Sequence, residues 1–283
     1  MSASRRWKQI WRRGPAILYI TVVVFFALFP FYWMALTSLK ASDQIFADPP
    51  TFFPQEIHLD AYRELLFEPN SDFRMFMRNS FVVATTTGVL ASLFAALAAY
   101  AFSKFAFPGN NPLAFSLFLT QLFPHAVIIV PLFVIFRRLN LYDTFGALIL
   151  ANMVFALPVA IWLTIGFFDS IPNELMEAAQ IDGCSRFSVL FRIILPISYT
   201  GIVATFMYIF IGVWSELLFA VTFTTKREVR VLPLALSDEI GQYTTDWNGL
   251  LAASTLTAVP VVVIFLLLQR FFVAGLTEGA MKG

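Results

Sequence analysis

Six polar side chains stand inside long apolar stretches of the sequence. A polar group in a membrane interior is costly, so such residues usually face a protein interior or a cavity. The six are Gln121, His125, Asn152, Tyr208, Trp214 and Glu216. Gln121 and His125 are four residues apart and therefore share one face of a helix. Amides and hydroxyls can hydrogen-bond the hydroxyls of a solute such as a sugar while aromatic faces pack on its ring, so we expect a solute path here. The alternatives are hydrogen bonds that join helices, and an aromatic anchor at the bilayer surface.

The sequence contains none of the common residue motifs for catalysis or for binding a cofactor. It lacks the nucleotide-binding pattern G-x-x-x-x-G-K-[ST], the nucleophile elbow G-x-S-x-G and the zinc helix H-E-x-x-H. Cys184 is the only cysteine, and His58 and His125 are the only histidines, so a disulfide within the chain and a multi-cysteine metal site are excluded. The formal net charge of +1 argues against a nucleic-acid partner. We therefore expect a chain that is not an enzyme and binds no metal.

Composition places the chain in the lipid bilayer. It is 59% hydrophobic and 13% charged, with a mean hydropathy of +0.76, whereas soluble domains are about 45–50% apolar and 25% charged. A bilayer core needs about 20 helical residues, and six stretches are long enough. They are Ala16–Leu36, Ser80–Phe102, Leu113–Phe136, Phe145–Phe168, Ser198–Phe223 and Leu250–Val273. Backbone groups in lipid must be satisfied within their own segment, which predicts an all-α protein with six transmembrane helices.

Charge at the N-terminus predicts the orientation. Residues 1–15 hold five Arg or Lys residues and no acid, so the positive-inside rule places this end in the cytoplasm. Six spans then return the C-terminus to the same side and make 169–197 a cytoplasmic segment. The expected outer loops are 37–79, 137–144 and 224–248. Arg137 and Arg138 lie on the outer side and oppose the rule.

A polar block, "PNELMEAAQIDGCSRFSVLFRIILP", interrupts the apolar spans at Pro172–Pro196. Its first half consists of strong helix formers after a proline, and Gly183 is suited to a left-handed stop. A second helix would place an apolar stripe on one face, formed by Phe187, Leu190, Phe191 and Ile194. The block therefore predicts a helix–turn–helix on the cytoplasmic side. The alternative is an amphipathic connector that lies on the bilayer.

The block resembles the "EAA" loop of ABC importer permeases. Glu177-Ala178-Ala179 is followed by Gly183 and then by Ile193-x-Leu195-Pro196 at the family's spacing. The stretches "NSFVVATTTGVLASLFAALAAYAFSKFAFPG", "LPLALSDEIGQYTTDWNGLLAAS" and "QRFFVAGLTEGAMKG" are similar to the maltose-type carbohydrate permeases, on the side of their second, shorter subunit. One departure is Trp214-Ser215-Glu216, where the family often has Trp-Asn followed by an acid.

The resemblance implies a type I importer permease that forms half of a sugar path. Its implied partners are a second, non-identical permease, a dimer of ATPase subunits that bind ATP and magnesium, and an extracytoplasmic solute-binding protein. The residues that the resemblance implies for coupling to the ATPase are Glu174, Glu177, Ala178, Ala179, Asp182, Gly183, Phe187 and Pro196. The residues that the resemblance implies for contact with the solute-binding protein are Asp238, Gln242, Tyr243 and Asp246. The expected location is a bacterial or archaeal cell membrane, with residues 1–15 as a basic tail and 16–283 as one permease domain.

Two other functions stay open at this stage. The same architecture serves importers of solutes other than sugars, such as amino acids or peptides. The other alternative hypothesis is an ion-coupled secondary transporter. Against it, the spans lack a chain of buried carboxylates and show no inverted repeat.

Overall fold

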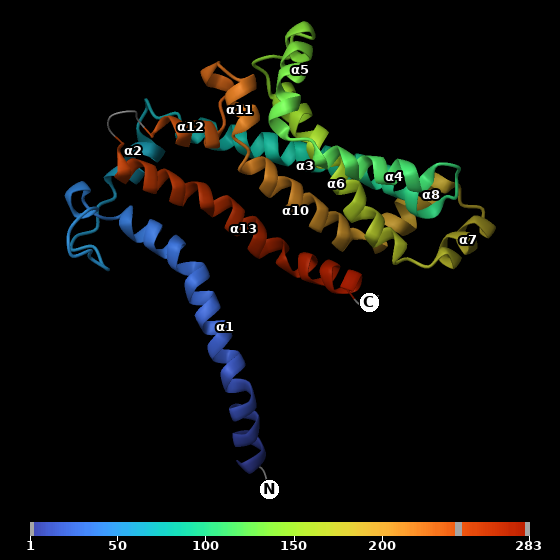
Figure 1. Cartoon of the computed structure of the whole chain (residues 1–283), viewed down its shortest axis with the longest axis horizontal. Helices are drawn as coiled ribbons and strands as arrows, with labels where there is room; N and C mark the ends of the chain where they lie inside the picture. The colour runs from blue at the N-terminus through green and yellow to red at the C-terminus, as the bar shows by residue number, and fades with distance from the viewer. Residues whose placement is uncertain (1–2, 241–244, 281–283) are drawn as a thin grey trace. The chain divides into compact units, whose positions relative to one another are not determined.

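The chain is helical throughout the part that the structure describes, as its apolar patterning predicts. The computed structural model describes residues 3–240 and 245–280, and the side chains of 14–237, 239–240 and 245–271 (Figure 1). No strand occurs among the described residues. The α-helices in chain order are α1 (Ala3–Thr37), α2 (Asp60–Phe67), α3 (Phe73–Lys104), α4 (Asn110–Leu119), α5 (His125–Arg138), α6 (Phe145–Asp169), α7 (Asn173–Ile181), α8 (Arg186–Val189), α9 (Leu195–Ile197), α10 (Tyr199–Trp214), α11 (Leu218–Phe223), α12 (Leu232–Asp238) and α13 (Trp247–Ala280). Short 3-10 or π turns are η1 (Ser42–Gln44), η2 (Thr120–Leu122), η3 (Leu190–Ile194) and η4 (Arg227–Val229).

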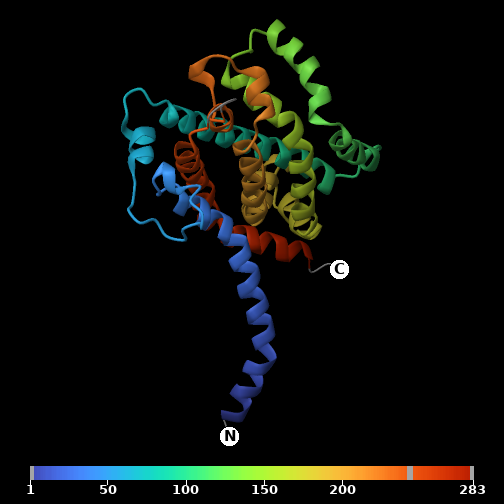
Figure 2. The same cartoon turned by 60° about the vertical axis from the view of Figure 1, so that its left-hand side comes forward.

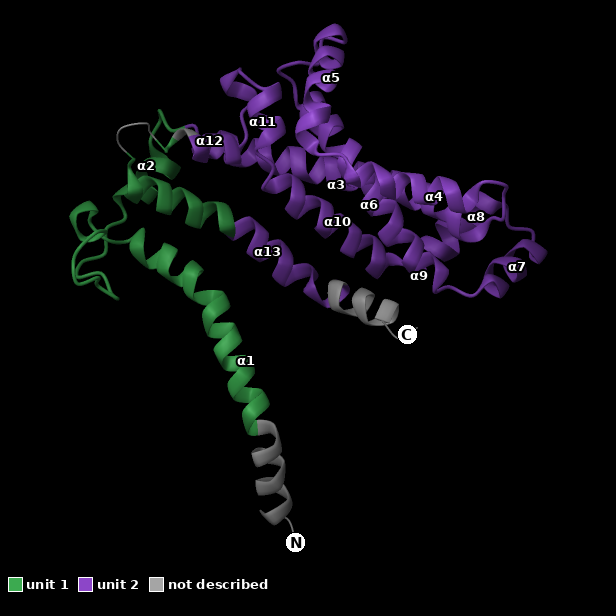
Figure 3. Cartoon of the chain, in the orientation of Figure 1, with its two compact units in different colours: residues 1–71, 239–258 green, residues 72–238, 259–283 purple. Residues whose placement is uncertain are grey.

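The chain divides into two compact units, drawn in green and purple in Figure 3. One consists of residues 1–71 and 239–258, and the other of residues 72–238 and 259–283. The larger unit is built on α3, α6 and α10, which pack against one another. The expectation of a single domain over 16–283 stays a prediction.

Small residues let these three helices approach closely. Ala91 and Ala95 of α3 and Ala160 of α6 are fully buried in one cluster with Ile161 and Ile209. A methyl group added at Gly88 of α3 would lie 2.8 Å from the ring of Phe206, which shows how tightly α10 covers it. Close packing of this kind is typical of helices in a membrane, where lipid gives no hydrophobic drive for association.

The predicted spans are recovered with two corrections. α1, over Gly14–Thr37, α3, α6 and α13, over Trp247–Phe271, are each long and apolar enough to cross a membrane. The third predicted span is not one straight helix, because α4–η2 meets α5 at 97°, a bend that is visible in green in Figure 2. Phe123 is extended there, with ψ of 126°, since the ring of Pro124 disfavours a helical residue before it.

The fifth predicted span is also broken. α10 ends at Trp214 rather than Phe223, and α11 follows as a separate short helix. The hydroxyl of Ser215 donates to the carbonyl oxygens of Ile211 and Gly212, so it competes for the last groups of α10. At its other end α10 meets the helical run 186–197 at 78°. The described residues thus provide four unbroken candidate spans, or six if each bent pair is one crossing.

The smaller unit is held by a buried lysine beside the end of α1. Lys40 is only 1% exposed, and its Nζ donates to the carbonyl of Thr51 at 2.6 Å while lying 4.6 Å above the ring of Trp33. Asn248 Nδ2 donates to the backbone oxygen of Lys40 at 2.6 Å. The hydroxyls of Ser38 and Tyr62 share a hydrogen bond of 2.5 Å, which ties α2 to the same place. The loop predicted at 37–79 is therefore folded around specific polar contacts.

Candidate coupling segment, solute pocket and outer loop

Gly183 stops α7 as the sequence predicts. Its φ is +85°, in the left-handed region. The amide of Gly183 donates to the oxygen of Gln180 at 3.0 Å, and the amide of Cys184 donates to the oxygen of Ala179 at 2.9 Å. These two bonds form a Schellman motif, in which a glycine reverses the chain and satisfies the last carbonyls of a helix. Ser185 then caps α8 by accepting from the amide of Ser188 at 3.2 Å.

The two helical arms of this segment pack on each other through one buried face. Met176 and Ala179 of α7 are buried in a cluster with Val189, Leu190 and Ile194. Ala179 is therefore buried in this cluster, whereas Ala178 is exposed. Of the two alanines that the motif brings forward, only Ala178 is accessible to another chain.

The predicted apolar stripe of the second arm is wrong in part. Leu190 and Ile194 are buried, but Phe187 is 71% exposed and Phe191 is 52% exposed. The arm passes through a π turn at Leu190–Ile194, so a period of 3.6 residues does not hold along it. That turn directly precedes Pro196, which has no amide and whose ring would crowd the carbonyl of Arg192 in a regular α-helix.

Most of the predicted coupling residues lie on the exposed surface of the segment. These are Glu174, Glu177, Ala178, Asp182, Gly183, Phe187 and Pro196. Ile181 is 86% exposed and was not among the predicted residues. An apolar side chain at the last position of a helix, next to an acid and a turn glycine, is the signal that could have identified it. The surface thus combines carboxylates with two large, exposed apolar side chains.

Polar side chains at the end of α3 fix the segment to the spans. The Tyr100 hydroxyl donates to the carbonyl of Arg186 at 3.1 Å. Lys104 Nζ donates to the carbonyl of Ile171 at 2.7 Å and to Oδ1 of Asn173 at 3.1 Å. The segment is therefore anchored on α3 at both of its arms.

Five of the six predicted path residues come together in one pocket. Gln121, His125, Asn152, Tyr208 and Glu216 line a cavity of about 460 Å³ that is bordered by η2, α5, α6, α10, α11 and α13. The described lining contains no Lys or Arg side chain. Trp214 is the exception: it does not line this pocket, is 4% exposed and stacks on Phe210 with ring centroids 5.6 Å apart. Trp214 packs in the core, and its place on a solute path stays a prediction.

A stack of aromatic rings forms one wall of this pocket. The rings of Phe155 and Phe219 are stacked with centroids 5.4 Å apart, and the His125 ring lies 4.0 Å from that of Phe155. The sequence analysis did not select Phe155 and Phe219, since single aromatic residues inside apolar helices carry no distinguishing signal. Such rings, next to hydrogen-bonding groups, suit a ligand with both an apolar face and polar edges.

Hydrogen bonds already occupy part of the polar lining. Gln121 Nε2 donates to the carbonyl of Phe155 at 3.2 Å, and Asn152 Nδ2 donates to that of Leu148 at 2.9 Å. The Glu216 carboxylate accepts from the amide of Phe219 at 2.9 and 3.0 Å, and so caps the start of α11. Each side chain keeps further polar capacity, because an amide oxygen and a carboxylate accept more than one hydrogen bond.

A buried carboxylate holds the start of the predicted outer loop 224–248. Asp143 accepts hydrogen bonds from the hydroxyl and the amide of Thr225 and from the amide of Lys226, the last at 2.9 Å. Burial by itself would raise the pKa of Asp143. The hydrogen bonds from Thr225 and Lys226 and the charge of Lys226 outweigh that effect, and the pKa lies below its ordinary value.

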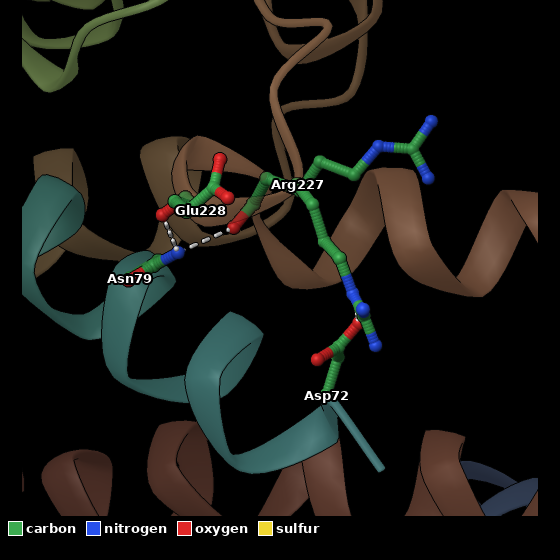
Figure 4. A network of polar contacts seen from close by, with 5 residues as sticks. Asp72, Asn79, Arg227 and Glu228 are labelled. Carbon is green, nitrogen blue, oxygen red and sulfur yellow. Dashed lines mark hydrogen bonds and ion pairs between the residues drawn. The ribbon is translucent and has the colours of Figure 1, made fainter. Parts of the chain in front are cut away.

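The next part of this loop is held by α3, as Figure 4 shows. Asn79 donates from Nδ2 to the carbonyl oxygens of Glu228 and Arg230, and Asp72 pairs with Arg227. The predicted binding-protein contacts lie beyond this anchored part. Gln242, Tyr243 and the side chain of Asp238 fall outside the described residues, and Asp246 is exposed.

Comparison with known proteins gives matches over most of the chain. Residues 77–278 match the family described as "Binding-protein-dependent transport system inner membrane component". The sulfoquinovosyl glycerol transport system permease protein SmoH of Agrobacterium fabrum is 34% identical over 256 residues, which cover 90% of this chain and 89% of that protein. The trehalose/maltose transport system permease protein MalG of Thermococcus litoralis is 31% identical over 282 residues, which cover 98% and 99%.

A solved structure matches the fold along its whole length. It is a chain of a bacterial ABC transporter that imports the acidic polysaccharide alginate, with a TM-score of 0.76 and 22% sequence identity. The match covers 96% of this chain and 99% of that one.

Proposed function

The chain belongs to the inner membrane components of binding-protein-dependent transport systems, and from that premise we propose that it is one permease subunit of an ATP-driven carbohydrate importer. The observation that carries the sugar assignment is the near full-length similarity to permeases named for sulfoquinovosyl glycerol and for trehalose and maltose. The pocket is consistent with such a solute, because stacked rings and hydrogen-bonding edges suit a ligand with an apolar face and polar edges.

The exposed side of the segment 169–197 is the proposed coupling surface. Glu174, Glu177 and Asp182 offer carboxylates to basic side chains of a partner, and Ile181 and Phe187 offer apolar area that water would otherwise cover. An exposed apolar patch with a polar rim is typical of a protein interface. In this proposal a separate dimer of ATPase subunits binds ATP and magnesium and seats the turn at Gly183 in a cleft.

The proposed orientation places the segment and both chain ends in the cytoplasm of a bacterial or archaeal cell. The basic N-terminal tail supports it through the positive-inside rule. The pocket then lies within the bilayer, and a second, non-identical permease completes the path around it. The loop 224–248 faces an extracytoplasmic solute-binding protein.

The pocket's proposed contribution is to guide a solute between the two permeases. Gln121, Asn152 and Glu216 supply polar groups to the lining, while Phe155 and Phe219 form the ring wall. Substituting Phe219 with Ala removes one stacked ring, so transport should fall while the complex still assembles. Equal transport by this variant would remove the pocket from the path.

Two measurements test this function together. The tagged chain is purified with the products of its neighbouring genes, and co-elution of an ATPase is expected. The co-encoded binding protein is then titrated with a panel of sugars and amino acids, and tight binding of a sugar is expected. If an ATPase co-elutes but the binding protein binds amino acids, the assignment as an ATP-driven importer stands and the assignment of a sugar substrate is wrong. Transport without an ATPase, driven by an ion gradient, would overturn the importer itself.

A further inference from the structure

α3 holds polar anchors at both of its ends. It has 32 residues and contains no proline, whereas α5, α6 and α13 each have one inside. Asn79 and Tyr100 are separated by 21 positions, which at about 1.5 Å per residue is roughly 31 Å. That distance is close to the thickness of a bilayer core, about 30 Å. The two sets of anchors therefore lie at opposite surfaces of the membrane in the proposed orientation.

At the outer end the anchor is Asn79, which is 4% exposed. Its side-chain Nδ2 donates two hydrogen bonds, to the carbonyl of Glu228 at 2.9 Å and to that of Arg230 at 2.8 Å. Ser80 adds a third bond, because its hydroxyl oxygen accepts from the amide of Leu232 at 2.8 Å. The segment 228–232 has no strand beside it, so these side chains satisfy backbone groups that a ladder would otherwise pair. Figure 4 shows Asn79 pointing at this loop from α3.

At the inner end the anchors are Tyr100 and Lys104, which bind the coupling segment at Arg186, Ile171 and Asn173. The outer loop and the coupling segment are thus attached to the same helix by polar bonds, most of them buried or half-buried.

The middle of α3 is locked by packing. Ala84, Ala91, Ala95 and Ala99 are fully buried, and Gly88 lies under the ring of Phe206. Close-packed interiors transmit displacement because they have little room to deform. A shift or rotation applied at residues 79–80 therefore reaches residues 100–104 without a flexible joint between them.

We propose that Asn79 is a positioning residue through which docking at the outer loop acts on the coupling segment, with α3 as the connecting element. The inference rests on the proposed function, in which a binding protein stimulates a separate ATPase. It adds to that function a specific route and the residues at each end of it. Asn79 touches neither solute nor nucleotide in this account, and it acts by holding 228–232 on α3.

The test is a double-mutant cycle on the purified, reconstituted complex. Asn79→Leu keeps the size of the side chain and removes both bonds to the loop, and Tyr100→Phe removes only the hydroxyl at the far end. Each should lower the maximal rate of binding-protein-stimulated hydrolysis by about two- to thirtyfold, the size of effect found for residues along coupled networks. Basal hydrolysis should stay unchanged. The double variant should be no worse than the poorer single variant, because both changes interrupt one route.

Matched variants separate the route from general damage. Thr87→Val alters a buried hydroxyl in the middle of α3 that has no hydrogen-bond partner in the described structure, so it should keep full stimulation. Ser80→Ala is the milder change at the outer end if Asn79→Leu fails to assemble. Two results would overturn the proposal. In the first, the losses of stimulated hydrolysis multiply in the double variant. In the second, Asn79→Leu changes only the binding-protein concentration that gives the half-maximal rate.

Hydrogen exchange tests the anchor independently of transport. In the purified chain, Asn79→Leu should speed amide exchange at residues 228–232, and Tyr100→Phe should not. Unchanged exchange in Asn79→Leu would refute the anchor even in a working importer. A wild-type complex with no stimulated ATPase would instead refute the proposed function, while the exchange result would still decide on the anchor.

Discussion

Replacing Gly183 with valine is the perturbation whose cost the structure isolates best. The residue is exposed, with φ of +85°, and a β-carbon built there meets no atom within 4 Å. A β-carbon at this position therefore meets no steric clash in the free chain. The remaining cost is the left-handed backbone itself, about 1–2 kcal/mol for a residue with a β-carbon.

That cost translates into a loss of coupling that can be measured. If the bound ATPase requires the reversed turn, a penalty of 1–2 kcal/mol weakens association by about five- to thirtyfold. Insertion should survive, because the transmembrane helices bury their own faces elsewhere. We expect Gly183→Val to reach the membrane at a near-normal level, to retain less ATPase on purification and to lose stimulated hydrolysis. Hydrolysis in reconstituted vesicles is the readout, with the amount of permease as control.

Two further variants assign the cause. Gly183→Asn adds bulk at the same exposed position, but asparagine tolerates the left-handed region, so it should couple nearly as well as glycine. Gly166→Ala adds a methyl group inside α6, where it also meets nothing within 4 Å, and should be silent. Asparagine as damaging as valine would mean that bulk at the interface, not backbone strain, is responsible. Full coupling by Gly183→Val at equal expression would refute the reasoning and leave the segment a surface connector.

Further outcomes follow from the same account. A thiol reagent that cannot cross membranes should label Cys184 in inside-out vesicles but not in intact cells, and labelling from outside would reverse the orientation. Replacing Asp238–Asp246 with a Gly/Ser linker should preserve assembly and basal hydrolysis but reduce transport, and normal transport would make this loop a mere connection. The lowered pKa of Asp143 stabilises the folded chain above about pH 3.9, the ordinary value, and this contribution is lost as pH falls through the lower, folded value. The Asp143→Asn variant should therefore unfold at a lower temperature than the wild type at neutral pH, and its stability should not show this loss at low pH. Identical dependence of the unfolding temperature on pH in the two proteins would contradict the role of Asp143 in holding the loop.

The sequence predicted the elements whose local chemistry leaves few alternatives. Gly183 was expected to stop α7 in the left-handed region, and it does, because a helix followed by glycine is a local signal. The apolar lengths identified the four spans that are unbroken helices, since the bilayer sets one requirement for all of them, but they did not show that the third and fifth predicted spans are broken. The clustering of Gln121, His125 and Asn152 followed from their cost in an apolar helix, which leaves an interior position as the natural place.

The rest depended on contacts between distant segments. The apolar length of a span does not reveal the bend at Pro124 or the break after Trp214, because membrane helices can also continue through such positions. Trp214 and Tyr208 are both aromatic residues of the same predicted span, yet packing buries the side chain of Trp214 and leaves that of Tyr208 exposed. Asn79 gave no signal at all, because its partners Glu228 and Arg230 lie about 150 positions away in the sequence.

The most direct test of the central claim is uptake of a bound sugar by vesicles that contain the purified complex. We expect that an ATPase co-elutes with the chain, and that uptake requires both ATP and the sugar-loaded binding protein, with hydrolysis rising when that protein is added. Uptake that proceeds from an ion gradient without ATP, or a chain that transports with no ATPase attached, would contradict it.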